Sequence, residues 1–322
     1  MRVAIVGAGA IGSFFGARLA ARTGAQVSAL ARGATLDALR RHGWRLDSAD
    51  GPTLRSPLSA ASDVAAALGV QDLVIVALKA PALPAVAPTL VPLLGPHTVV
   101  LPAMNGVPWW FCEGMRLASV DPGGRIAAAI PFESVLGCVV HASCSVVEPG
   151  RVRHHVGQRV IVGEPRGCPS ARAQAVTDLL SQAGFELTLS SDVRQDIWYK
   201  LWGNMTMNPV SALTGATVDR VLADPLVREF CSAAMREAAA VGARIGCPIA
   251  QDPEDRHAVT EKLGAFKTSM LQDVQAGRPI ELDALVGAVR EIGQAHGVAT
   301  PAIDALFGLS RLFGGVRGLY AS

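Results

Sequence analysis

Short apolar runs alternate with amphipathic stretches over the first half of the chain. The runs Val3–Val6, Gln26–Ala31, Leu73–Leu78 and Thr98–Leu101 have strand length, whereas Ile11–Ala21 has the spacing of a helix. Continuous apolar strands separated by helices are typical of a parallel sheet that is covered on both faces. We therefore expect an α/β fold with an N-terminal Rossmann-type, doubly wound sheet.

The sequence pattern changes between Gly137 and Gly163, where valine-rich runs follow one another. Pro149-Gly150 and Gly157 are residues that favour turns, so the region predicts mixed or antiparallel strands that close the first domain.

Strand signals stop after Asp192, and alanine-rich helical patterns take over. Asp224 before Pro225 has the character of a helix cap followed by a first-turn proline. We expect an all-α C-terminal domain, with a boundary near residue 190 that separates a Rossmann domain, 1–190, from a helical domain, 191–322. Helices are expected over 192–207, 225–245, 256–275, 281–296 and 301–312.

Composition narrows the class of protein. Of the 322 residues, 50% are hydrophobic and 17% are charged, which is enough apolar material for a packed core. The net charge of +2 gives no reason to expect nucleic acid as a partner. The most apolar window, 73–94, contains Lys79 and several prolines and does not suit a membrane span. With no targeting segment recognised at the N-terminus, we expect a cytoplasmic protein.

The six cysteines are scattered and form no C-x-x-C pair. The sequence therefore predicts neither a metal site nor a disulfide scaffold. An apolar helical domain is compatible with a homodimer as well as with a monomer.

A G-x-G-x-x-G motif follows the first predicted strand and opens the first predicted helix. Its glycines allow a tight turn, a close approach of the backbone to a pyrophosphate, and close packing of helix on strand. The free N–H groups of the helix N-terminus then favour phosphate. The predicted dinucleotide loop consists of Gly7, Ala8, Gly9, Ala10, Ile11 and Gly12.

The charge environment of this loop indicates which dinucleotide is bound. An NAD site needs an acid after the second strand, but no Asp or Glu occurs before Asp37. Arg32 follows the second strand instead, where a guanidinium can pair with a 2′-phosphate. We expect NADPH as the cofactor; the alternative for Arg32 is a solvated surface arginine.

Two further polar groups lie where predicted strands end. Lys79 follows the strand at 73–78, and Asn105-Gly106 follows the strand at 98–101. Ligands of open α/β sheets bind beyond the carboxyl ends of the strands. Taken alone, Lys79 is equally compatible with a surface lysine, and Asn105-Gly106 with a simple turn. Because both follow the ends of neighbouring strands, together they favour a ligand site.

A polar stripe marks the first helix of the second domain. Lys200, Asn204 and Asn208 recur every fourth residue and so share one face of an apolar and aromatic helix. Buried polar groups need partners, either inside the protein or on a ligand. The alternative is a lysine that reaches solvent and asparagines that cap or bridge helices. Pro209 predicts a kink or an end of the helix here.

These residues together resemble the ketopantoate reductase family, the 2-dehydropantoate 2-reductases, over nearly the whole chain. The matching features are the glycine loop, Lys79, Asn105-Gly106, the segment Lys200–Pro209, and Ser269–Asp273 followed by Glu281. The resemblance implies a Rossmann domain joined to a helical one, and NADPH-dependent reduction of a 2-oxo acid, ketopantoate, in pantothenate biosynthesis.

The resemblance also implies roles for single residues. Lys200 is implied as the general acid, with Glu281 organising it and the nicotinamide end of the site. Asn204, Asn208 and Ser269 are implied to hold the substrate. Asn105 is implied to touch both cofactor and substrate, while Lys79 and Arg32 match cofactor-binding positions.

One departure separates this sequence from the best-known ketopantoate reductases, which carry a further asparagine soon after the Asn-Pro pair. The stretch 213–218 offers only Thr214 and Thr217. Another 2-oxo acid or a 3-hydroxy acid therefore stays open as the substrate. A protein that binds NADPH without turnover is a third hypothesis, against which the Lys200–Glu281 pair argues.

Overall fold

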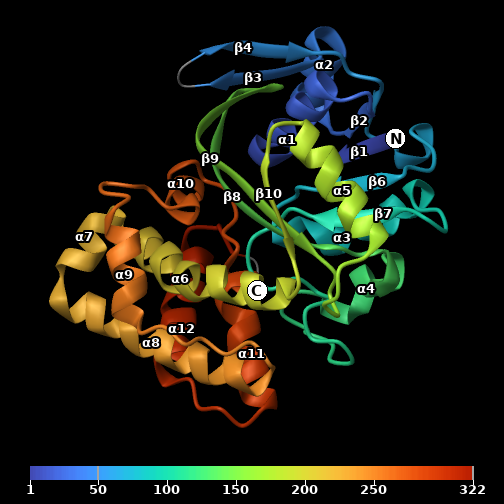
Figure 1. Ribbon diagram of the computed structural model, residues 1–322. Helices are drawn as coiled ribbons and strands as arrows, with labels where there is room; N and C mark the ends of the chain where they lie inside the picture. The colour runs from blue at the N-terminus through green and yellow to red at the C-terminus, as the bar shows by residue number, and fades with distance from the viewer. Residues whose placement is uncertain (49–50, 321–322) are drawn as a thin grey trace. The chain divides into compact units, whose positions relative to one another are not determined.

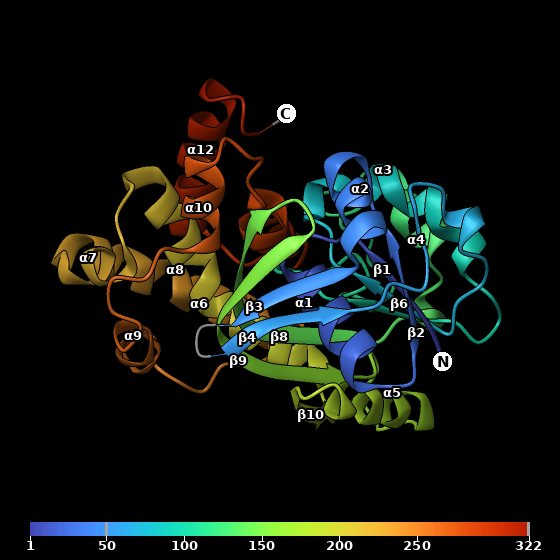
Figure 2. The same ribbon diagram turned by 90° about the horizontal axis from the view of Figure 1, so that it is seen from above.

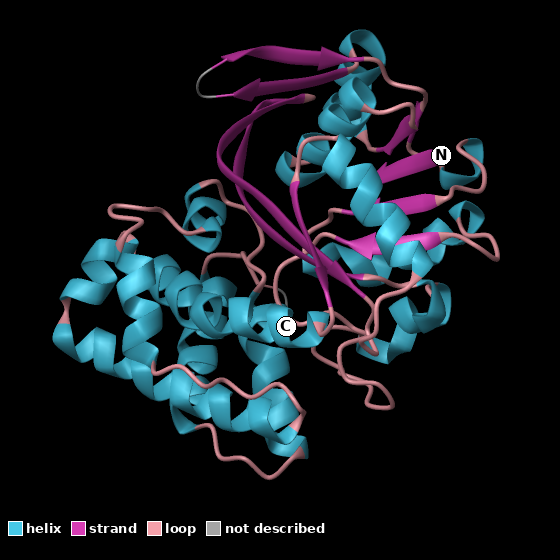
Figure 3. Ribbon diagram, in the orientation of Figure 1, coloured by secondary structure: helices cyan, strands magenta, loops and turns pink. Residues whose placement is uncertain are grey.

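The computed structural model describes residues 1–48 and 51–320, and its contacts divide the chain into two compact units. The first unit comprises 1–104 and 124–196, and the second comprises 105–123 and 197–322. The division after Asp196 lies six residues beyond the boundary placed at 190, and the segment 105–123 belongs with the helical unit. Strands lie in the first unit, and the second is built from helices and loops (Figure 3).

A parallel sheet forms the centre of the first unit. Of the residues described, five strands pair in the order β5-β2-β1-β6-β7, and the register aligns Val6 with both Leu30 and Val76. The apolar runs of the sequence are the buried strands of this sheet, so the predicted Rossmann-type fold is confirmed. The strands are β1 (Arg2–Val6), β2 (Gln26–Leu30), β5 (Ala61–Ser62), β6 (Leu73–Val76) and β7 (Val99–Pro102).

A second sheet in the same unit has the order β10-β9-β3-β4, with β8 paired to β9 (Figure 2). The hairpin of β8 and β9 confirms the antiparallel strands predicted from Gly137 to Gly163, with its turn at Pro149-Gly150. The turn predicted at Gly157 is wrong, because Gly157 lies inside β9 where the ladder shifts register. The strands are β3 (Trp44–Ser48), β4 (Gly51–Ser56), β8 (Gly137–Glu148), β9 (Arg151–Gly163) and β10 (Glu186–Ser190).

Helix α1 packs against strands of both sheets, so it forms the shared core of the first unit. Its Gly16 lies against the ring of Trp44 in β3, where a Cβ would come within 2.6 Å of that ring. The helices of this unit are α1 (Ala10–Arg22), α2 (Gly33–His42), α3 (Leu83–Val86), α4 (Arg125–Ala129) and α5 (Ala171–Gln182).

The second unit confirms the predicted all-α region (Figure 1). Asp224 caps α8 by accepting from the N–H groups of Leu226 and Val227, as its position before Pro225 predicts. Its helices are α6 (Val193–Thr214), of which 193–196 belong to the first unit, α7 (Val218–Ala223), α8 (Pro225–Arg244), α9 (Pro253–Glu261), α10 (Ser269–Gln275), α11 (Ala288–Ala295) and α12 (Pro301–Val316).

Two helix predictions in this unit are wrong. Helix α6 continues through Pro209 to Thr214, although proline removes an N–H that would bond to the carbonyl of Met205. The residues around Pro209 are buried, and their packing outweighs the local preference of proline. The single helix expected over 256–275 is two helices, because Thr268 caps a new one by accepting from the N–H of Leu271.

None of the helices in the described part of the chain is long and apolar enough to cross a membrane.

Asp47 links β3 to β9 through a buried side chain. Its carboxylate accepts from the hydroxyl of Thr53 at 2.8 Å and pairs with Arg151 at 3.0 Å. Burial alone would raise the pKa of Asp47, but the hydrogen bonds and charges of its neighbours outweigh it and lower the pKa. The stabilisation is therefore present above the unfolded value of 3.8 and is lost as the pH falls through the lower folded value.

We predict that Asp47→Asn lowers the free energy of unfolding at neutral pH by about 1–2 kcal/mol and flattens its fall in acid. Denaturant titrations at neutral pH and below pH 3.8 measure both effects. Asp37→Asn, at an exposed position of α2, is the matched control. An equal acid slope in Asp47→Asn and wild type would contradict the prediction.

Candidate active site

The turn between β1 and α1 fits a bound pyrophosphate. Gly7 has a φ of +89°, and a Cβ on Gly12 would lie 2.0 Å from the carbonyl oxygen of Gly7. Only glycine therefore permits this turn and this approach of helix to strand. Gly9 caps α1, and a Cβ there would meet nothing within 4 Å. The turn is thus open at the helix N-terminus, where free N–H groups and the helix dipole favour phosphate.

Two cationic side chains lie at the same edge of the parallel sheet. Arg32 is the N-cap residue of α2, two residues after β2, and Lys79 follows β6. Because β2, β1 and β6 are parallel neighbours in register, Arg32, Gly7 and Lys79 all follow the carboxyl ends of adjacent strands. Arg32 and Lys79 are both exposed. The first unit therefore holds the glycine loop, Arg32 and Lys79 at one edge of its sheet, whereas Asn105 and Glu281, which the sequence also assigned to the cofactor, belong to the second unit.

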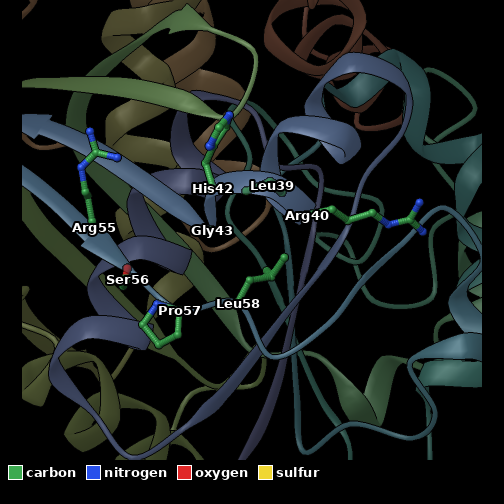
Figure 4. A pocket seen from close by; sticks show the side chains of 8 residues that line it. All are labelled: Leu39, Arg40, His42, Gly43, Arg55, Ser56, Pro57 and Leu58. Atoms are coloured by element: carbon green, nitrogen blue, oxygen red, sulfur yellow. The ribbon is translucent and has the colours of Figure 1, made fainter.

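A separate basic pocket of about 390 Å³ lies at the other end of α2 (Figure 4). Arg40, His42 and Arg55 line it, together with Leu39, Gly43, Ser56, Pro57 and Leu58. Helix α2 has ten residues, so this end is about 15 Å from Arg32. The negative end of the helix dipole disfavours an anion in this pocket, whereas the positive end at Arg32 favours one.

In the second unit, Lys200 forms a hydrogen bond with Asn105. The ammonium Nζ of Lys200 in α6 donates to the side-chain oxygen Oδ1 of Asn105 at 2.8 Å. The two residues are 95 positions apart in the chain. A lysine ammonium carries three N–H donors, of which this bond uses one. The structure thus joins two residues that the sequence singled out separately.

The rest of the polar stripe follows Lys200 along α6. Asn204 is half-buried and Asn208 is 6% exposed, and the unbroken helix keeps both on the face of Lys200. Ser269 is the first residue of α10 and is half-buried. To the other residues that the structure describes, the side chains of Asn204, Asn208 and Ser269 make no hydrogen bond.

Glu281 is buried, with 5% of its surface exposed. It precedes a π-helical turn at Asp283–Gly287, whereas the sequence predicted a regular helix from Glu281 onward. Nothing in the apolar spacing of this region distinguishes a π-helical turn from an α-helix. π-Helical turns are rare and frequent at functional sites.

The segment 105–123 is the main feature that the sequence analysis missed. Glu291 in α11 accepts from the N–H groups of Ala118 and Ser119 at 2.7 and 2.9 Å. The ring of Phe111 stacks on that of Trp198 in α6 at 5.7 Å. The signal was present as the aromatic run Trp109–Phe111 directly after Asn105-Gly106, in what otherwise looks like a loop. This anchoring keeps Asn105 in the helical unit, next to Lys200.

Comparisons with known proteins identify relatives over the whole length of the chain. The family model described as ketopantoate reductase PanE/ApbA matches residues 3–167, and the model of its C-terminal part matches residues 192–313. A 2-dehydropantoate 2-reductase of Mesorhizobium japonicum is 42% identical over 100% of both chains. The chain belongs to the ketopantoate reductase family. The expected family, and with it the expected oxidoreductase, is confirmed.

Solved structures extend the likeness to the fold. The crystal structure of a provisionally assigned ketopantoate reductase from Ralstonia solanacearum MolK2 is 57% identical over 99% of both chains, with a TM-score of 0.95. A D-mandelate dehydrogenase in complex with NADH and anilino(oxo)acetate is 23% identical, with a TM-score of 0.85, and shares the fold.

The departure from the best-known ketopantoate reductases lies at the end of α6. The hydroxyl of Thr214 donates to the carbonyl of Val210 at 2.7 Å and accepts from the N–H of Ala216. Thr217 is the N-cap residue of α7, without a side-chain hydrogen bond to the helix, and its proximity lowers the pKa of the Asp219 carboxyl. Both threonines thus have local partners, and neither stands in for the missing asparagine by its contacts.

Proposed function

We propose that this protein reduces a 2-oxo acid, with 2-dehydropantoate as the first candidate, and that NADPH is the reductant. The observation that carries the proposal is the bond between Lys200 and Asn105, which fixes a proton donor in a member of the ketopantoate reductase family. The product would be the 2-hydroxy acid pantoate.

The first unit supplies the residues for the cofactor. The loop of Gly7, Gly9 and Gly12 fits the pyrophosphate, and Arg32 fits the 2′-phosphate that distinguishes NADPH from NADH. Lys79 adds a second cation at the same edge of the sheet. When bound, NADPH supplies the hydride that reduces the carbonyl carbon of the substrate.

Lys200 supplies the proton. Its ammonium donates a hydrogen bond to the ketone oxygen of the substrate and stabilises the negative charge that develops there. It then gives that oxygen a proton, becomes a neutral amine, and regains the proton from solvent after the product leaves. The bond from Lys200 to Asn105 holds the flexible lysine side chain in one orientation before the substrate arrives.

The remaining residues have supporting roles in this proposal. Glu281, a buried acid, helps to organise Lys200 and the nicotinamide end of the site. Asn204, Asn208 and Ser269 offer amide and hydroxyl groups to the hydroxyl and carboxylate of the substrate. Asn105 serves both ligands, since its side chain carries a donor as well as the acceptor used by Lys200.

Steady-state kinetics on a panel of acids test the substrate. We expect the highest kcat/KM for 2-dehydropantoate among aliphatic and aromatic 2-oxo acids, with 3-hydroxy acids tested in the oxidative direction. A much higher kcat/KM for another acid would leave the proposed reaction type intact but show that 2-dehydropantoate is not the preferred substrate. This alternative has a specific basis in the missing asparagine near Thr214 and Thr217.

The oligomeric state and the cellular location of the protein are further predictions. A homodimer and a cytoplasmic location are consistent with a biosynthetic reductase. Light scattering on the purified protein measures the first, and fractionation of cells the second.

A further inference from the structure

The π-helical turn Asp283–Gly287 supports the start of the segment 105–123, which we call the Asn105 loop. The carbonyl of Ala284, inside the turn, accepts from the N–H of Val107 at 2.7 Å. Gly106 packs against the same residue, and a Cβ on Gly106 would lie 2.5 Å from the Ala284 oxygen. With a φ of +85°, Gly106 also has a backbone conformation that other residues rarely adopt. The position of Asn105 therefore depends on the position of this turn.

The C-terminal segment 319–320 holds the turn and the residues before it. The carbonyl of Leu319 accepts from the N–H of Ile280 at 3.0 Å, directly before Glu281. The hydroxyl of Tyr320 donates to Oδ1 of Asp283 at 2.8 Å, two residues after Glu281. The segment thus brackets Glu281 with one backbone bond and one side-chain bond.

The protonation states of Tyr320 and Asp283 favour the hydrogen bond between them. Burial, followed by the hydrogen bond to Asp283 and its charge, raises the pKa of Tyr320, so the phenol keeps its proton and remains a donor. Burial raises the pKa of Asp283, and the hydrogen bond from Tyr320 opposes that rise. The hydrogen bond therefore partly offsets the cost of placing the Asp283 carboxylate in a largely buried position.

We propose that Tyr320 and Asp283 are positioning residues, which hold the π-helical turn and, through Ala284 and Val107, keep Asn105 bonded to Lys200. The inference rests on the proposed function, because Asn105 and Lys200 matter only if they form the reaction site. It assigns a task to the segment 319–320, which neither motif nor spacing in the sequence indicates.

Tyr320→Phe tests the proposal because it keeps the ring and removes only the hydroxyl. We expect kcat to fall about threefold to tenfold, the scale of one lost hydrogen bond, while the Kd for NADPH is unchanged. Hydrogen exchange measured by mass spectrometry should show faster exchange in the peptide that contains Val107. This second readout does not depend on activity.

Ser232→Ala is the matched control in the same unit. It removes another buried hydrogen bond, between Ser232 in α8 and His257 in α9 at 3.0 Å, and does not touch the Asn105 loop. We expect a similar loss of Tm with unchanged kcat and unchanged exchange at Val107. An equal fall of kcat in both variants would show a general loss of stability and would overturn the positioning role.

Two variants of Asp283 complete the test. Asp283→Asn keeps a carbonyl oxygen that accepts from Tyr320 and should retain most of the activity, whereas Asp283→Ala should match Tyr320→Phe. The double variant Asp283→Ala/Tyr320→Phe should be no worse than either single one, since both remove the same bond.

The two failures are distinguishable. If wild type is active but Tyr320→Phe retains kcat and Val107 protection, the positioning role is wrong and the proposed function stands. If wild type reduces no 2-oxo acid, the proposed function fails, while faster exchange at Val107 in Tyr320→Phe would still establish that the segment 319–320 holds the Asn105 loop.

Discussion

Replacing Lys200 by alanine should lower kcat for reduction of the 2-oxo acid by about 10²–10⁴-fold, the usual contribution of a positioned general acid. The variant removes the only group in this account that protonates the forming alkoxide. Binding of NADPH, measured by fluorescence titration, should be retained, because the residues proposed for its phosphates belong to the first unit.

The controls for this experiment separate chemistry from folding. Lys262→Ala removes an exposed lysine of the same unit, after α9, and should leave kcat unchanged. Lys200→Arg keeps a positive charge but not an acid of suitable pKa, and should remain strongly impaired. Unchanged turnover in Lys200→Ala would eliminate the mechanism.

Replacing Arg32 by alanine should weaken NADPH binding by about 10–100-fold, since charge-assisted hydrogen bonds contribute about 1.5–3 kcal/mol. The Kd for NADH should hardly change, because NADH has no 2′-phosphate. The preference for NADPH over NADH should therefore collapse, which titration of the variant with both dinucleotides measures.

Arg55→Ala is the matched control for Arg32. Arg55 is an exposed arginine of the same unit and lines the basic pocket at the far end of α2 (Figure 4). We expect its NADPH affinity to equal that of wild type. If Arg55→Ala loses the preference for NADPH and Arg32→Ala keeps it, the 2′-phosphate binds in the pocket instead.

Much of the fold follows from local sequence pattern. The buried strands of the parallel sheet are continuous apolar runs. Helix α8 begins at Asp224-Pro225, where the aspartate side chain caps the helix and the proline ring suits its first turn. The features that pattern reasoning missed depend on tertiary contacts. The buried packing around Pro209 keeps α6 unbroken. The cap at Thr268 starts a new helix within a stretch whose helical pattern predicted one continuous helix.

The candidate site divides in the same way. Glycines and cations at the ends of predicted strands could be assigned from the sequence, because parallel strands bring their carboxyl ends together. The pairing of Lys200 with Asn105 could not, since it depends on the segment 105–123 joining the helical unit. The same is true of Tyr320, whose partner Asp283 is 37 residues away.

Product analysis of one reaction, with purified wild type, NADPH and 2-dehydropantoate, tests the proposed reduction directly, and mass spectrometry identifies the product. We expect one pantoate to form for each NADPH consumed, with NADH a much poorer reductant. Tight binding of NADPH without its consumption, for 2-dehydropantoate and for every other acid of the panel, would rule out the proposed reduction and favour a protein that binds the dinucleotide without turnover.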